Sequence, residues 1–125
     1  MNGEESELLE AIDENTKFFL LKIPNQDCLM NSMILQEIAL TENSSQAFEA
    51  IFERDKEDKN SIILFVTIQG SEQLQGVCKV SQSKLIEEVK EDWKQYWQGK
   101  FKSAINVTWL IPNCAMPIAK VNQFL

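Results

Sequence analysis

The stretch from Ser61 to Val80 limits the possible folds of this chain more than any other segment. The residues from Ile62 to Ile68 form a nearly continuous run of β-branched, aliphatic and aromatic side chains, which is typical of a strand buried on both faces. Gly70 can take the positive φ of a tight turn, so a second strand is expected after it. Gly76, inside that second strand, indicates a bulge or a close approach of another group to the backbone. The sequence therefore predicts a hairpin at the centre of the core.

Amphipathic helices and short strands surround this hairpin. Asn25 is the expected cap of a helix that runs to about Gln36, and the segment 43–45 offers caps for a second helix that continues into a charged, solvated stretch. A third helix is predicted from Ser81 to Trp97, with Gly99 as its stop. The apolar positions that define these three helices are Leu29, Met30, Met33 and Ile34, then Ala47, Phe48, Ile51 and Phe52, then Leu85, Ile86, Val89 and Trp93.

The remaining segments predict strands. Residues 17–23 are apolar and end before Pro24, residues 37–41 are a short extended candidate, and alternation of apolar and polar residues begins at Phe101 and reaches Ile111. The last residues, 118–125, are apolar enough for a further strand or a short helix. The order strand, helix, strand, helix, hairpin, helix, strand predicts an α+β domain whose mixed or antiparallel sheet curls into a barrel with flanking helices.

Length and charge limit the classes of function. A chain of 125 residues is long enough for one domain with its own core. The net charge of −7 opposes non-specific binding to nucleic acids and to anionic membranes, so an RNA-binding role requires a local basic patch. Three widely spaced cysteines without a zinc or disulfide pattern favour an intracellular setting, nuclear or cytoplasmic. We expect residues 1–15 to be an acidic, partly ordered lead-in and not a signal peptide, and no apolar run reaches membrane-spanning length.

The residue types argue against catalysis. The chain contains no histidine, which is the commonest general base and a frequent zinc ligand. It has no glycine-rich phosphate loop, no G-x-S-x-G motif and no carboxylate pair at a catalytic spacing. Cys28 has no sequence partner that would serve as a base, and it is interpreted as a small buried hydrophobe. The sequence predicts a protein that is not an enzyme and that uses no metal and no cofactor.

The three tryptophans carry more functional information. Aromatic side chains hold flat bases by stacking and methylated cations by cation–π attraction. Trp93 and Trp97 are separated by one helical turn in the predicted third helix, and Trp109 continues the alternation of the last strand. Each tryptophan also lies on an apolar stripe, so core packing and ligand contact both remain open. Trp109 is the most core-like of the three.

The order of sequence motifs along the chain resembles that of a known family, the YTH domain. The segments KFFLLK, AFEAIF, SIILFVTIQGSEQLQGVCKV, GKFKSAINVTW and MPI are similar to the family's opening [RY]-[FY]-F-[LIV]-[LIM]-K strand, its LNxAF helix, its VxLxFSVxxSGxFxG hairpin, its GxFxVxW strand and its LPF segment. The resemblance covers Thr16 to Leu125 as a single domain. It implies a PUA-like barrel that binds single-stranded RNA and holds N6-methyladenosine in a cage of two tryptophans and a third apolar residue.

This sequence departs from the family at several ligand-contacting places. The first cage tryptophan is expected in a G-x-W-[SA]-T segment, which here reads EIALT and places Ile38 or Leu40 at the aromatic wall. The resemblance implies that Trp93 or Trp97 is the second cage tryptophan. The family's C-terminal R-D-G-Q-E segment, which supplies phosphate-contacting charge, has no counterpart before Leu125. The residues expected to contact phosphates are Lys22, Lys79, Lys100 and Lys102.

The sequence is compatible with two functions, and a third interpretation is an unrelated α+β protein with another role. The first is a divergent RNA-binding module whose recognition of N6-methyladenosine is weakened or lost, because a missing aromatic wall removes about 1–3 kcal/mol of stacking. The alternative is a protein-interaction domain with a degenerate pocket, which contacts a partner through the Met and Ile residues of the first helix or through Val121 to Leu125. An open aromatic pocket around Ile38, Trp93 and Trp97 favours the first function, and a filled pocket favours the second.

Overall fold

The computed structural model of this chain describes residues 12, 14–54, 61–71, 73–96, 100–112 and 116–117. The order of elements is the one expected from the sequence, although two of the elements differ in extent. They are β1 (Lys17–Ile23), α2 (Gln26–Leu35), β2 (Glu37–Leu40), α3 (Glu42–Arg54), β3 (Ile62–Ile68), β4 (Gln73–Ile86), α4 (Glu91–Lys94), β5 (Ser103–Ile111) and β6 (Met116–Pro117).

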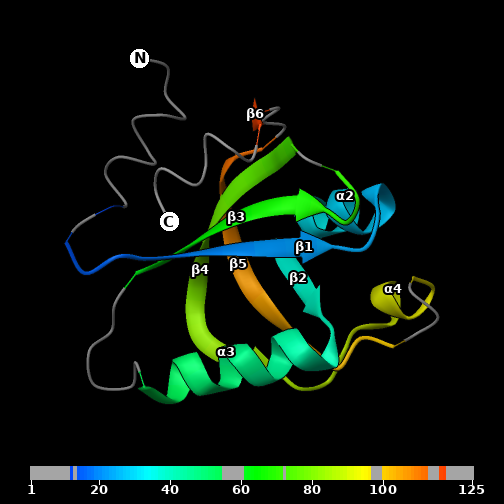
Figure 1. Cartoon of the computed structure of the whole chain (residues 1–125). Helices are drawn as coiled ribbons and strands as arrows, with labels where there is room; N and C mark the ends of the chain where they lie inside the picture. The colour runs from blue at the N-terminus through cyan, green and yellow to red at the C-terminus, as the bar shows by residue number, and fades with distance from the viewer. Residues whose placement is uncertain are drawn as a thin grey trace.

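One curled, mixed sheet organises the domain. The strand order is β1-β3-β4-β5-β2, and β6 pairs with β4. β1 and β3 are parallel, whereas the other pairs along this path are antiparallel. Figure 1 shows α3 crossing one end of the sheet, while α2 and α4 lie beside β2. The α+β class and the curled sheet with flanking helices are therefore confirmed.

The central hairpin forms as predicted. β3 is almost fully buried along its length. Gly70 has a φ of 85° and provides the turn into β4. The close approach expected at Gly76 is also present, because a Cβ atom built there would lie 2.8 Å from Cζ3 of Trp109. A β-bulge interrupts the pairing between Val66 and Thr67. The hairpin is the core of the sheet, and Trp109 covers its glycine.

Both faces of the sheet carry apolar clusters, because side chains alternate along each strand. The larger cluster contains even-numbered residues of β3 together with buried residues of all three helices, so we call its side of the sheet the helix face. The smaller cluster lies on the opposite face, and its buried members are Ile63, Phe65, Leu74, Val77 and Leu110. β3 reads as a continuous apolar run because it contributes to both clusters.

α2 begins where the sequence predicts, after the cap residue Asn25. The side chain of Asn25 accepts a hydrogen bond of 2.9 Å from the backbone N–H of Cys28, which satisfies a free donor of the first turn. The buried face of α2 consists of Cys28, Leu29 and Ser32. Two residues that were expected on the apolar stripe, Met30 and Ile34, are instead exposed by 54% and 76%. The helix therefore has a narrower buried face than its sequence suggests.

The cap of α3 differs from the prediction. The helix begins at Glu42, and the backbone N–H of Ser44 lies 3.4 Å from Oγ1 of Thr41, so Thr41 occupies the capping position instead of residues 43–45. Its buried side chains include Phe48, Ile51 and Phe52, as predicted. Ala47 is exposed, and Ser45 is buried instead. Ser45 is retained in the core because the Oγ of Ser103 donates a hydrogen bond of 2.7 Å to its Oγ.

The predicted helix over Ser81–Trp97 is wrong in its first half. β4 continues to Ile86, and after a shift in register Leu85 pairs with Ile105 and Ile86 with Ala104. Only the single turn of α4 is helical in the described part of that range. The apolar spacing of Leu85, Ile86 and Val89 fits a helix, but an available partner strand outweighs this local preference.

Several predictions fall outside the described residues. They concern the lead-in over 1–11 and 13, Trp97, Gly99, Cys114 and the segment 118–125. Among the helices of the described ranges, none is long and apolar enough to cross a membrane.

Candidate nucleic-acid interface

Trp93 is the central residue of the candidate site. It is carried by α4, a single turn in which the backbone N–H of Trp93 donates to the carbonyl of Lys90 over 3.0 Å. This turn packs the indole against the domain, and Trp93 is only 1% exposed. The sequence left core packing and ligand contact open for Trp93, and the structure has the indole in the core.

Two aromatic rings cover the indole of Trp93. Phe101 lies 5.7 Å away between ring centroids, at an interplanar angle of 71°. Tyr96 lies 6.4 Å away at 66°. Both are edge-to-face contacts, the favourable geometry for aromatic pairs. Because Trp93 is only 1% exposed, a base has no open indole face on which to stack.

A buried carboxylate holds the polar end of the same indole. Nε1 of Trp93 donates a hydrogen bond of 3.0 Å to Oε1 of Glu37. Nζ of Lys90 lies 3.0 Å from Oε2 of Glu37, and the side-chain exposures are 51% for Lys90 and 1% for Glu37. Oε2 accepts no hydrogen bond from the described residues, so charge pairing with Lys90 compensates it. Because an unpaired buried charge is costly, Glu37, Trp93 and Lys90 hold one another in place.

The alternation along β2 separates Ile38 and Leu40 from this contact. Glu37 faces Trp93, so Ala39 faces the same side, and the next residues point the other way. Leu40 pairs with Ser103, whose hydroxyl bonds Ser45 of α3. Ile38 and Leu40 are thus buried on the α3 side of β2, within the same core cluster as Trp93.

Sequence reasoning missed Glu37. When Thr41 is placed on the threonine of the G-x-W-[SA]-T motif, Ala39 stands at the tryptophan position and Glu37 at the glycine position. A charged residue in place of a glycine, at the start of a short apolar strand, was the available signal. It indicates a buried carboxylate, which requires a polar partner.

The four predicted phosphate-contacting lysines divide into two groups. Lys100 and Lys102 are exposed and flank Phe101, which packs on Trp93. Lys79 pairs with Ile63, a member of the smaller cluster, and therefore lies on the opposite face of the sheet. Lys22 alternates with Leu21 and Ile23 of the helix-face cluster, so it also points to that opposite face. Only Lys100 and Lys102 lie near Trp93, where Lys90 adds a third cationic group.

Trp109 has a structural role. Its Nε1 donates to the carbonyl of Ser32 over 3.2 Å, and its backbone N–H donates to Oε1 of Gln36 over 3.3 Å. Its ring lies against Gly76. Trp109 thereby ties α2 to the hairpin. It is only partly buried, whereas Trp93 is fully buried, so the prediction of Trp109 as the most core-like tryptophan is wrong.

The described residues offer little for nucleophilic or metal chemistry. Burial raises the pKa of the Cys28 thiol, with the negative charge of Asp27 adding to the effect and the Asn25 hydrogen bond opposing it. Burial also raises the pKa of the Cys78 thiol far above its usual range. Both thiols therefore stay protonated at neutral pH. No group of three or more metal-ligating side chains occurs among the described residues.

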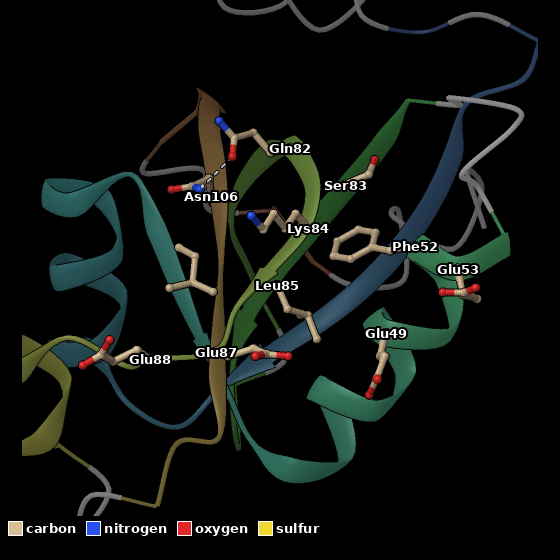
Figure 2. Close-up of a pocket in the computed structure, with 11 residues that line it drawn as sticks. Glu49, Phe52, Glu53, Gln82, Ser83, Lys84, Leu85, Glu87, Glu88 and Asn106 are labelled. Carbon is tan, nitrogen blue, oxygen red and sulfur yellow. Dashed lines mark hydrogen bonds between the residues drawn. The ribbon is translucent and has the colours of Figure 1, made fainter.

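A cavity of about 720 Å³ lies elsewhere, between α3 and the second half of β4 (Figure 2). Its walls are rich in glutamate, and none of the predicted site residues lines it.

The curled mixed sheet and its three helices define a small α+β domain. A profile of the YT521-B-like domain, YTH, matches residues 16–125. This chain belongs to the YTH family. A search of the curated proteins finds no match.

Solved structures agree with the family assignment. The YTH domain of Zygosaccharomyces rouxii MRB1, in complex with N6-methyladenosine RNA, is 16% identical with a TM-score of 0.67, and the match covers 86% of this chain and 64% of that one. The Pho92 YTH domain in complex with m6A is 21% identical with a TM-score of 0.71, covering 91% and 67%. The Mmi1 YTH domain in complex with RNA is 16% identical with a TM-score of 0.63, covering 90% and 66%. At these identities the likeness establishes the fold.

Proposed function

We propose that this chain is a binding module for single-stranded RNA, without enzymatic activity, whose recognition of N6-methyladenosine is weakened or lost. Family membership over residues 16–125 supports RNA as the ligand class, as do the RNA complexes of similar domains. The proposed loss of methyl recognition rests on the burial of the Trp93 indole.

The observation that carries this proposal is the burial of Trp93 behind Glu37. To stack on a base, the indole must leave Glu37 and its aromatic neighbours. A hydrogen bond to a charged group contributes about 1.5–3 kcal/mol, and stacking on a base returns about 1–3 kcal/mol. Moving the indole away from Glu37 therefore costs most of the free energy that stacking on a base provides. The small Ala39 at the motif's tryptophan position offers no second wall.

Phosphate contacts then supply most of the affinity. Lys90, Lys100 and Lys102 are exposed around the closed Trp93, whereas Lys22 and Lys79 lie on the opposite face. Each phosphate neutralised on a single strand contributes about −0.7 to the slope of log K against log salt. Lys90 already pairs with Glu37, so we expect a slope of about −1.4 from Lys100 and Lys102, in an otherwise acidic protein.

The test uses two fluorescent single-stranded RNAs of identical sequence, with and without one N6-methyladenosine, titrated at low and at physiological salt. We expect salt-dependent binding with affinities for the two RNAs that agree within about threefold, because little stacking energy remains for discrimination. The double variant K100A/K102A should weaken both RNAs equally. The matched control K22A/K79A removes the same charge from the opposite face and should have a smaller effect.

Two results would contradict this function. A preference of tenfold or more for the methylated RNA means that Trp93 opens and a working cage forms. Absence of salt-dependent binding to either RNA removes RNA as the ligand.

A second candidate function is protein interaction, and one observation favours it. Met30 and Ile34 are exposed one turn apart on α2, so they present an apolar strip on the surface. If α2 mediates association, sedimentation velocity will show a concentration-dependent species that M30S/I34S abolishes. A monomer at all concentrations argues against self-association through α2. The other predicted contact, Val121 to Leu125, lies outside the described residues.

A further inference from the structure

The cavity between α3 and β4 has the shape of an open groove, which we call the α3–β4 groove. In Figure 2 the ring of Phe52 points from α3 toward Lys84 and Leu85 of β4. A volume of about 720 Å³ is within the range that holds a drug-sized ligand or a few residues of a peptide. The groove is lined by Glu49, Phe52, Glu53, Gln82, Ser83, Lys84, Leu85, Ile86, Glu87, Glu88 and Asn106.

The backbone beside this groove lacks a regular strand partner. β3 reaches β4 only as far as the pair Ile63 and Lys79. On the other side, Val80 pairs with Val107 and Leu85 with Ile105, so the segment 81–84 lies opposite the single residue Asn106. No described strand is in register with 81–84. A strand segment without an in-register neighbour is a template for an added strand.

The inner parts of both walls of the groove are apolar. Phe52 is buried in its α3 wall, and Leu85 and Ile86 are half-buried in its β4 wall. An extended segment directs alternate side chains to the same face, so one apolar side chain of a bound strand would reach Phe52 and Leu85. The neighbouring side chains of the same strand would then point to the rim.

The rim is acidic. Glu49 on α3 and Glu87 and Glu88 after β4 are all exposed carboxylates. Lys84 is the single basic residue among the lining residues. This charge repels the phosphates of a nucleic acid and attracts lysine and arginine side chains. The net charge of −7 also disfavours a second copy of this chain as the occupant.

We propose that the α3–β4 groove binds an extended, basic segment of a partner protein, which adds to β4 along residues 81–84. Apolar residues of the segment contact Phe52 and Leu85, and its alternate lysine or arginine residues face Glu49, Glu87 and Glu88. The groove shares no residue with the RNA-binding surface around Trp93, so this inference does not depend on the proposed function.

The test measures binding of a short fluorescein-labelled peptide of alternating lysine and valine, with its ends blocked. We expect saturable binding at low salt that weakens about fivefold in E87Q/E88Q, because two exposed ion pairs are lost. The matched control E14Q/E42Q removes two exposed glutamates from outside the groove and should bind like the wild type. A peptide with alternate backbone N-methyl groups should bind more weakly, because it cannot form the ladder to β4. Backbone amide shifts should be largest at Gln82 to Leu85.

Other outcomes overturn the proposal. Equal weakening in E87Q/E88Q and E14Q/E42Q, or equal binding of a glutamate–valine peptide, means that the groove does not select a basic segment. Displacement of the peptide by RNA assigns the groove to the nucleic-acid interface. Self-association that E87Q/E88Q abolishes assigns it to a second copy of the chain. Because Glu87 and Glu88 are exposed, an unchanged urea midpoint will show that the variant is folded.

Discussion

The contact between Glu37 and Trp93 leads to a quantitative prediction about stability. Replacing Glu37 with alanine leaves the buried indole N–H of Trp93 without its acceptor at 3.0 Å. An unsatisfied buried donor costs about 1–3 kcal/mol. Loss of the ion pair to Lys90 adds no more than about 1 kcal/mol, because the Lys90 side chain is half exposed and solvent screens it. We therefore expect E37A to lower the free energy of unfolding by about 3 kcal/mol.

Glutamine at position 37 isolates the contribution of the indole bond. E37Q keeps a carbonyl oxygen that can accept from Nε1 of Trp93, but it loses the charge that pairs with Lys90. We expect E37Q to cost less than E37A, because it keeps the acceptor of the indole, and K90A to cost more than about 1 kcal/mol, because it leaves the buried carboxylate of Glu37 unpaired. In a double-mutant cycle, E37A and W93F should show a coupling energy of at least about 1 kcal/mol, since both remove the same bond.

Urea denaturation followed by circular dichroism measures these differences. With a slope of about 1–3 kcal/mol per molar urea, E37A should lower the midpoint by about 1–3 M relative to the wild type. The reasoning is refuted if E37A and E37Q have the same stability within about 0.5 kcal/mol, or if the coupling energy with W93F is zero within the same error. Either result would mean that the indole is held by packing on Phe101 and Tyr96 instead.

Two further predictions concern the hairpin and the buried thiols. G76A should destabilise the protein by about 1–3 kcal/mol in the same urea assay, because the new Cβ meets Trp109 at 2.8 Å and the carbonyl of Ile111 at 3.0 Å. G70A should also destabilise the protein, but through backbone strain at the turn: Gly70 has open space around it and a φ of +85°. The thiol of Cys78 has a raised pKa when folded and an ordinary value of 9.0 when unfolded, so the unfolded state releases its proton first as pH rises. The wild-type free energy of unfolding should therefore fall above about pH 9 by more than that of C78A, and equal pH slopes for the two proteins would contradict this.

The central hairpin and most element types follow from local patterns. Ile62 to Ile68 have too many consecutive apolar residues for a one-sided strand, and β3 does contribute to both apolar clusters. Asn25 caps α2 through a bond that spans only three residues, so it is readable from sequence. The same local information supports the family resemblance, because the motifs sit on these strands and helices.

The candidate site was less accessible to sequence reasoning. Trp93 was identified as a key residue, but its bond to Glu37 joins residues 56 positions apart. The placement of Ile38 and Leu40 at an aromatic wall followed from comparing apolar residue types, whereas strand alternation directs both toward α3. Lys22 and Lys79 are basic residues like Lys100 and Lys102, and only the sheet separates them onto opposite faces.

The amino-acid sequence determined the strand–helix order, the hairpin and the family, because hydrophobic periodicity and turn residues act over a few neighbouring positions. Two features depended on the folded chain. The segment from Ser81 to Ile86 fits a helix by its spacing, yet it is a strand because Ile105 and Ala104 lie beside it. Trp93 is likewise buried because β2, α4 and Phe101, just before β5, converge on one indole. Such contacts arise between distant segments, so no local pattern of this sequence specifies them.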